Sequence, residues 1–221
     1  MGINERREKE KEIRRNDIIE AAERVFFSKG YDAATMDDVA KEAEFSKRTV
    51  YVYFSSKEQI YFEIMIKGYR LLIGMLDADM KKLKTDDPIG TIRQMAVTQY
   101  NFSREYPDYF NAIMEYENSE LDFQKGVSDA SKEECYSLGE KVFGYLTGAL
   151  KKGIEKGVFR SDLDEEKTAL VLWSCMLGVF NTVKRKEKYI LNYHNTSADE
   201  LISTASAFLL RSIVKDGGND L

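Results

Sequence analysis

The chain of 221 residues carries a net charge of −5, and 43% of its residues are hydrophobic. This length suits one or two domains with a substantial core, and the acidic balance excludes a protein that binds nucleic acid over its whole surface. Only two prolines occur, and long stretches are rich in Ala, Leu, Glu and Lys. The composition therefore predicts an all-α protein.

A mixed-charge segment precedes the first predicted helix. Between residues 5 and 15 it holds four glutamates and six cations. The cations are Arg6, Arg7, Lys9, Lys11, Arg14 and Arg15. We expect a solvated, frayed helix extension rather than an arm that touches DNA. Beyond it, the apolar spacing of Ile18, Ala22 and Val25 predicts a helix that ends at Gly30.

A second helix is predicted to begin at Met36. The Thr35 hydroxyl can accept from an amide of the first turn, and Asp38 completes a capping-box pair. The residues that recur at helical spacing behind this cap form one apolar face that must be buried. They are Met36, Val39, Ala40 and Ala43.

A third helix is predicted over residues 47–54, with Ser46 as its cap. Val50 and Phe54 are four residues apart and should face the same core. Five polar or aromatic residues of the helix remain for other contacts: Lys47, Arg48, Thr49, Tyr51 and Tyr53. Cations and tyrosine hydroxyls suit phosphates, and Arg and Thr suit base edges.

The local charge agrees with this interpretation, because no acidic residue occurs from Phe45 to Lys57. Ser55 and Glu58 are spaced as a further capping box, with Lys57 in the first turn of the next helix, where it could hold a phosphate. An ordinary helical hairpin with a solvated basic face is the alternative. The combination of capping, spacing and charge favours a helix-turn-helix that reads DNA.

From Ile13 to Tyr61 the sequence resembles the N-terminal domain of the TetR/AcrR family of bacterial repressors, through FFSKGYDAATM, DDVAKEA, SKRTVYVYF and SKE. The resemblance implies a helix-turn-helix DNA-binding domain at 1–56 and a ligand-binding and dimerisation domain at 57–221. It also implies release from an operator when a small hydrophobic molecule enters the body. The DNA contacts carried over are Thr35, Ser46, Lys47, Arg48, Thr49, Tyr51, Tyr53 and Lys57.

Three positions depart from the family pattern. Glu44 stands where such proteins usually carry Gly in a left-handed turn, which costs on the order of 1 kcal/mol. Arg48 and Val52 also differ from the usual residues, so the operator sequence cannot be borrowed from relatives.

Six further helices are predicted after Ser55. Their expected ranges are 56–83, 88–105, 108–119, 122–156, a helix capped by Asp164, and 198–215. The last two helices carry apolar residues on more than one side, which suits a four-helix interface between two subunits. The expected interface residues are Leu172, Leu177, Phe180, Leu201, Ala205, Phe208 and Leu209. A homodimer would bring two heads to successive major grooves, roughly 34–36 Å apart.

Aromatic, methionine and polar residues of the body could line an effector cavity, although most aromatics at helical spacing are simply core. The candidates are Met95, Gln99, Phe110, Met114, Glu115, Phe143, Trp173 and Met176. A buried, ionised Glu115 would favour a cationic effector. No cofactor and no metal site is predicted.

Other functions have less support. His194, the only histidine, lies in a polar inter-helix stretch, and the chain lacks the usual catalytic motifs, so no enzyme is predicted. A helical adaptor without a DNA role is a further alternative, and activation rather than repression stays open. The two cysteines lack metal or redox spacing. Without an export segment or long apolar run, we expect a cytoplasmic protein with no membrane association.

Overall fold

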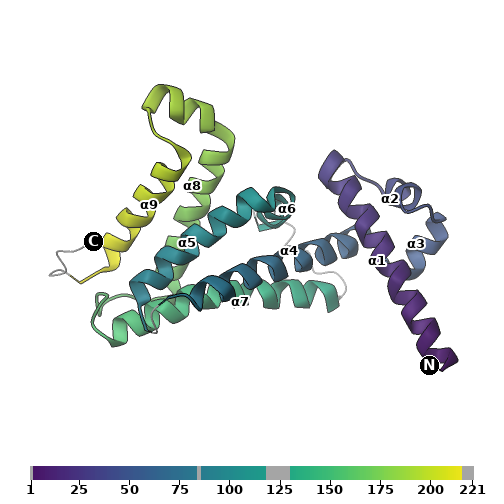
Figure 1. Cartoon of the computed structure of the whole chain (residues 1–221), viewed down its shortest axis with the longest axis horizontal. Coiled ribbons are helices and arrows are strands. Elements are labelled where there is room, and N and C mark those ends of the chain that lie inside the picture. The colour runs from purple at the N-terminus through teal and green to yellow at the C-terminus, as the bar shows by residue number, and fades with distance from the viewer. Residues whose placement is uncertain (1, 84–85, 118–129, 216–221) are drawn as a thin grey trace. The chain divides into compact units, whose positions relative to one another are not determined.

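The structure is a computed structural model, and it describes residues 2–83, 86–117 and 130–215. Within these ranges the chain forms nine helices and no strands, which confirms the all-α prediction (Figure 1). The helices are α1 Ile3–Lys29, α2 Met36–Glu42, α3 Lys47–Tyr53, α4 Lys57–Met80, α5 Pro88–Glu105, α6 Pro107–Glu117, α7 Ala130–Glu155, α8 Glu165–His194 and α9 Ala198–Ile213. No helix in the described ranges is long and apolar enough to cross a membrane.

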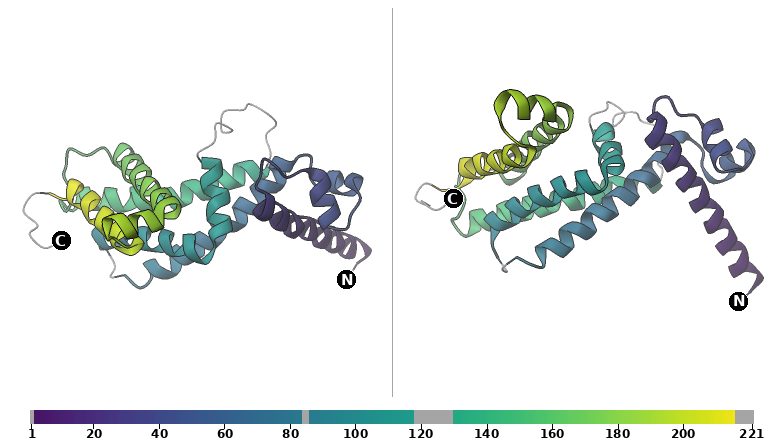
Figure 2. Two further views of the ribbon diagram at one scale, coloured as in Figure 1. Left: turned by 90° about the horizontal axis from the view of Figure 1, so that it is seen from above. Right: turned by 45° about the horizontal axis from the view of Figure 1, so that its top comes forward.

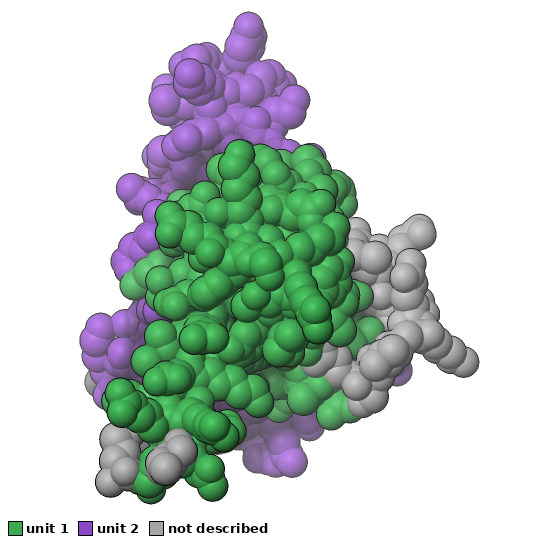
Figure 3. All heavy atoms as spheres, turned by 90° about the vertical axis from the view of Figure 1, so that its right-hand side faces the viewer, with its two compact units in different colours: residues 1–70, 106–138 green, residues 71–105, 139–221 purple. Residues whose placement is uncertain are grey.

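The chain divides into two compact units, coloured separately in Figure 3. Unit 1 holds residues 1–70 and 106–138, and unit 2 holds residues 71–105 and 139–221. The helices α4 and α7 therefore contribute residues to both units. In unit 1, α1 packs against α2 and α2 packs against α3. Ile18, Ala22 and Val39 are fully buried, as the apolar spacing of both helices predicted.

The start of α4 differs from the expected capping box. Ser56 accepts from the backbone amide of Gln59 at 3.1 Å, and the Gln59 side chain accepts from the Ser55 amide at 2.7 Å. The cap therefore lies one residue later than the Ser55–Glu58 spacing suggested, and Lys57 is the first helical residue. Two predicted boundaries lie outside the described residues: the end of the helix expected at 108–119, which corresponds to α6, and the start of the helix expected at 122–156, which corresponds to α7.

Unit 2 contains a helical pair, α8 and α9, which lie side by side in Figures 1 and 2. The Asp164 carboxylate accepts from the Lys167 amide at 2.9 Å, so the predicted cap of α8 is confirmed. The helix is kinked at Lys186 and ends at Asn195, whose left-handed φ of 49° closes it. A capping box between Ser197 and Glu200 then starts α9.

Candidate nucleic-acid interface

The first helix of the turn motif is fixed at its N-terminus by side chains. The Asp38 amide donates to Thr35 Oγ1 at 3.1 Å, and the Thr35 amide donates to Asp38 Oδ2 at 3.0 Å. This is the predicted capping box. Lys29 of α1 donates to Asp38 at 2.6 Å. That hydrogen bond, followed by those from Thr35, lowers the pKa of Asp38 from 3.8 to about 2. Local hydrogen bonds thus tie α2 to α1.

A left-handed residue makes the turn between α2 and α3. Glu44 has a φ of 57°, as expected from its position where glycine is usual. The Phe45 amide then donates to the carbonyl of Ala40 at 3.0 Å. A side chain in this conformation costs roughly 1 kcal/mol. The turn between the two helices therefore lowers the stability of the fold only slightly.

The second helix of the motif presents one face to the core and one to solvent. Ser46 accepts from the Thr49 amide at 3.1 Å, which confirms the predicted cap. Val50 is fully buried and Phe54 is 1% exposed, so both face the core as their spacing predicted. The short helix is therefore held by its cap at one end and by Phe54 at the other.

The outward face of α3 carries cations and large side chains. Arg48 is exposed, Tyr51 is 47% exposed and Val52 is 72% exposed. Lys47 is also exposed and bonds to Asp37 at 2.7 Å, an interaction that raises the pKa of the lysine. Val52 was not among the contacts expected from the sequence. Its position four residues after Arg48, away from the buried Val50, could have placed it on this face.

The remaining predicted contacts have different surroundings. The Thr49 hydroxyl lies 2.8 Å from the Ser46 hydroxyl, so both groups serve the cap of α3. Thr35 serves the cap of α2 in the same way. Tyr53 is half-buried at the end of α3. Among the predicted contacts, Lys47, Arg48 and Tyr51 are thus the exposed residues that take no part in a helix cap.

Lys57 is engaged within the protein rather than directed to solvent. Its ammonium donates to the carbonyl of Tyr31 at 2.7 Å and to that of Ala34 at 3.0 Å. It also lies 4.2 Å from the centroid of the Tyr31 ring. Burial raises the pKa of Tyr31 to about 12. The lysine therefore anchors the loop between α1 and α2 to the start of α4.

Helix α6 is hydrogen-bonded to α1 and α4 within unit 1. Glu23 of α1 accepts from the Tyr109 hydroxyl at 2.8 Å and from the Lys67 ammonium at 2.8 Å. The Tyr61 hydroxyl donates to the carbonyl of Ala112 at 3.2 Å, and burial raises the pKa of this tyrosine. These hydrogen bonds join α6 to α1 and α4.

Unit 2 contains a small, mainly apolar cavity of about 40 Å³. Four predicted pocket residues line it, namely Met95, Gln99, Trp173 and Met176. Phe143 contacts Trp173 edge-on, with ring centroids 6.3 Å apart. The other three candidates belong to α6 in unit 1: Phe110 and Met114 are buried, whereas Glu115 is exposed and accepts from Tyr61 at 3.3 Å.

The predicted interface residues of α8 and α9 differ in how far their own chain buries them. Leu172 and Phe180 are buried within their own chain, and Leu172 lines the cavity together with Leu209. Leu177, Leu201 and Ala205 are half-buried. Phe208 is 68% exposed. Val171 on α8 is 59% exposed and was not among the predicted residues.

The turn motif and the helical body both have known counterparts. Residues 18–64 match the family model for bacterial regulatory proteins of the tetR family. The transcriptional repressor NicS of Pseudomonas putida is 24% identical over 151 residues, which cover 67% of each chain. The fatty acid metabolism regulator protein of Bacillus subtilis is 25% identical over 201 residues, or 88% of this chain and 96% of the relative.

A solved structure extends the likeness to the fold of nearly the whole chain. The regulator AibR, in complex with isovaleryl coenzyme A and operator DNA, aligns with 89% of this chain and 98% of its own at a TM-score of 0.65 and 17% identity. The chain belongs to the TetR/AcrR family of DNA-binding transcriptional regulators.

Proposed function

We propose that this protein is a repressor that a small hydrophobic molecule releases from its operator. The observation that carries the DNA-binding part is the outward face of α3, where Arg48, Tyr51 and Val52 are exposed on a helix whose other face is packed in the core. Residues 1–56 would form the DNA-binding head, and residues 57–221 would bind the effector and the second subunit.

Each exposed residue of α3 suits a different contact in a major groove. The Arg48 guanidinium can donate two hydrogen bonds to a guanine edge, and Val52 can contact a thymine methyl group. Lys47, Tyr51 and Tyr53 would contact phosphates, which position the head. Ser46, Thr49 and Thr35 would act mainly through the caps that orient the two helices. Lys57 would support binding through the loop that it anchors.

The dimer interface is proposed on the outer faces of α8 and α9. Val171, exposed Cys175 and Phe208 provide apolar surface there that their own chain leaves uncovered. Burying such a face between two copies is favourable in proportion to its apolar area. The pairing would also supply the two heads that an operator with two half-sites requires.

The effector is proposed to be neutral and apolar at the end that enters the body. The residues around the cavity include no acid, and their polar groups are Gln99, Ser206 and the indole of Trp173. A cation would therefore be poorly compensated there. Because the cavity holds only about 40 Å³, an effector must displace its walls. Titration with acyl chains should release DNA, whereas hydrophobic cations should not.

Release would follow from a shift between two head spacings. An effector that binds only the splayed state draws the population away from the spacing that fits DNA. The bonds of Tyr109 and Lys67 to Glu23 would carry displacement of α6 to α1. Measuring the distance between two head labels with and without an effector tests this mechanism, and an unchanged distance would contradict it.

The DNA-binding proposal is tested with duplexes that the purified protein selects from a random pool. Arg48→Ala should weaken binding to the selected duplex by about 1 to 3 kcal/mol and relax base preference at one position. Arg93→Ala is the matched control, because Arg93 is an exposed arginine of α5. If the wild-type protein selects no sequence and shows no salt-sensitive binding, the adaptor alternative replaces this proposal.

A further inference from the structure

The N-terminal part of α1 is a helix that projects beyond its packed region. The helix is continuous over Ile3–Lys29, and every side chain from residue 5 to residue 14 is exposed. Figures 1 and 2 show these turns extending past α2 and α3 within unit 1. At about 1.5 Å per residue, the exposed turns up to Arg14 span on the order of 15 to 20 Å. The sequence alone suggested a frayed extension, in which the charged side chains would have no fixed orientation.

In a helix, the charges of this segment are sorted into separate stripes. Residues three or four apart lie on one face. Arg7, Lys11 and Arg14 follow that spacing, and so do Glu5, Glu8 and Glu12. The two stripes lie about a third of a turn apart around the helix axis. One side of the extension is therefore basic and another is acidic, although the segment looks evenly mixed in the linear sequence.

The basic stripe continues into the face of α1 that packs on α2. The same spacing leads from Arg14 to Ile18 and Ala22, which are fully buried. It leads on to Lys29, which bonds Asp38 of α2. Arg7, Lys11 and Arg14 consequently lie on the side of α1 that carries the turn motif.

The acidic stripe continues into a different face. From Glu12 the spacing leads through Ile19, which is 8% exposed, to Glu23. Glu23 bonds Lys67 of α4 and Tyr109 of α6. Glu5, Glu8 and Glu12 therefore lie on the side that faces α4 and α6, whereas Glu10, the fourth glutamate of the segment, lies beside the basic stripe and 3.8 Å from Arg6.

The exposed N-terminal part of α1 meets its packed part near the end of α3. Arg15 lies at the junction, with its guanidinium 5.0 Å from the centroid of the Phe54 ring and bonded to Glu63. Phe54 directly follows Tyr53, the last residue of α3. The exposed turns of α1 therefore start next to the residue that ends α3.

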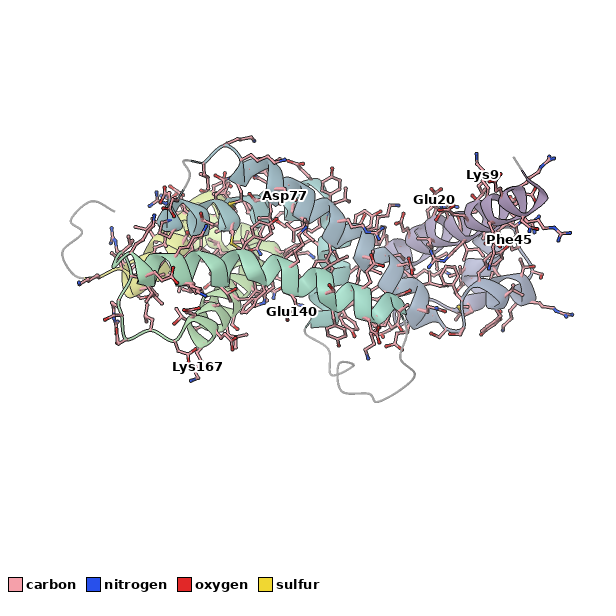
Figure 4. The ribbon with its side chains drawn as sticks, turned by 90° about the horizontal axis from the view of Figure 1, so that it is seen from below. Lys9, Glu20, Phe45, Asp77, Glu140 and Lys167 are labelled. Carbon is pink, nitrogen blue, oxygen red and sulfur yellow. The ribbon has the colours of Figure 1, made fainter. Side chains whose placement is uncertain are left out.

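The cations of the stripe are available for a new partner. Among the described residues, no ion pair involves Arg7, Lys11 or Arg14, whereas Arg6 lies 3.8 Å from Glu10. Figure 4 shows Lys9 and Glu20 on the side of α1 away from Phe45, which lies in the turn between α2 and α3. Arg6 and Lys9 are therefore cations of the same segment outside the basic stripe.

We propose that Arg7, Lys11 and Arg14 bind the phosphate backbone of duplex DNA that flanks the bases read by α3. This inference rests on the proposed DNA-binding function and adds a second, sequence-independent contact to it. Three cations along one side of a continuous helix complement the regular negative charge of the duplex. Glu5, Glu8 and Glu12 on the other side would be repelled by phosphate, which favours one orientation of the helix on the backbone.

Two double variants of equal charge test the proposal: Arg7→Gln/Lys11→Gln on the stripe and Arg6→Gln/Lys9→Gln outside it. Glutamine keeps the helix propensity close to that of the replaced residues, and circular dichroism checks that α1 is retained. The probe is a selected duplex with long flanks, and its affinity is measured over a range of NaCl concentrations. A duplex shortened to the selected bases is measured beside it.

The stripe variant should bind the long duplex at least tenfold more weakly than the wild type. The slope of log affinity against log salt should decrease by about 0.9 for each phosphate that the variant no longer neutralises. The other double variant should keep most of the slope, and the short duplex should hardly distinguish the two. Equal decreases in affinity for both variants, or an unchanged affinity for the stripe variant, would overturn the inference. Failure of the wild-type protein to bind any duplex would instead overturn the proposed function itself.

Discussion

The two helix pairs that define this protein are stabilised in different ways. The pair α2 and α3 consists of two helices of seven residues each, fixed by caps at Thr35 and Ser46. The pair α8 and α9 spans 30 and 16 residues and buries apolar side chains along its whole length. In the first pair, short-range hydrogen bonds determine which side chains point outward. In the second, packing against the rest of the unit determines it.

This difference explains which residues remain available for partners. On α3, Val50 and the adjoining Phe54 are buried, whereas Lys47, Arg48, Tyr51 and Val52 are exposed. On α8, apolar residues occur on several sides, and the structure buries Leu172 and Phe180 while leaving Val171 exposed. A long apolar helix can therefore bury one apolar face in its own chain and leave a second one exposed. A short capped helix with one buried face has only its opposite face exposed.

The largest effect is expected at the exposed surface of α9. Phe208→Glu places a charge on an apolar face, and it should weaken self-association at least a hundredfold, or about 2.7 kcal/mol. Analytical ultracentrifugation over a dilution series measures this change. Tyr193→Glu is the control, because Tyr193 is 79% exposed beyond the kink of α8. Equal effects of both substitutions would show that Phe208 has no special place in the interface.

The next effect is expected on stability, at Lys57, which anchors the loop between α1 and α2. Lys57→Met removes charge-assisted hydrogen bonds to the carbonyls of Tyr31 and Ala34, and it should lower the free energy of unfolding by about 2 to 3 kcal/mol. Urea unfolding measures the change, with Lys41→Met as an exposed control. Unchanged stability with a reduced salt dependence of DNA binding would instead make Lys57 the phosphate contact expected from sequence.

A substitution in the turn between α2 and α3 should increase the stability of the protein. Glu44→Gly relieves a side chain at a φ of 57°, and it should raise the free energy of unfolding by up to about 1 kcal/mol. Glu44→Gln is measured beside it, since glutamine removes the charge and keeps the strained backbone. If the two variants gain the same stability, charge rather than backbone conformation explains the gain.

The smallest effect concerns the pH dependence of the α2 cap. Bonds from Lys29 and Thr35 lower the pKa of Asp38 from 3.8 to about 2 in the folded protein. The carboxylate therefore stabilises the fold above pH 3.8, and this contribution is lost as the pH falls from 3.8 toward 2. Asp38→Asn should be less stable at neutral pH and should lose less stability across that window. Parallel acid-unfolding curves for both proteins would contradict this.

Local features of the sequence determined much of the fold. The caps at Thr35, Ser46 and Asp164 and the left-handed Glu44 were all predictable, because each depends on residues within a few positions. Hydrophobic spacing likewise predicted the burial of Val50 and Phe54. The outward direction of Arg48 and Tyr51 follows from the same short-range rules.

Only the tertiary structure decided how groups distant in sequence meet. The carbonyls around Lys57 come from residues more than 20 positions earlier, and no spacing rule could link them. The choice of Leu172 for the cavity and Val171 for solvent likewise depends on which neighbours cover α8. Capping and periodicity act over a single helical turn, whereas burial depends on every surrounding helix, so the sequence alone determined the elements and the packing decided their partners.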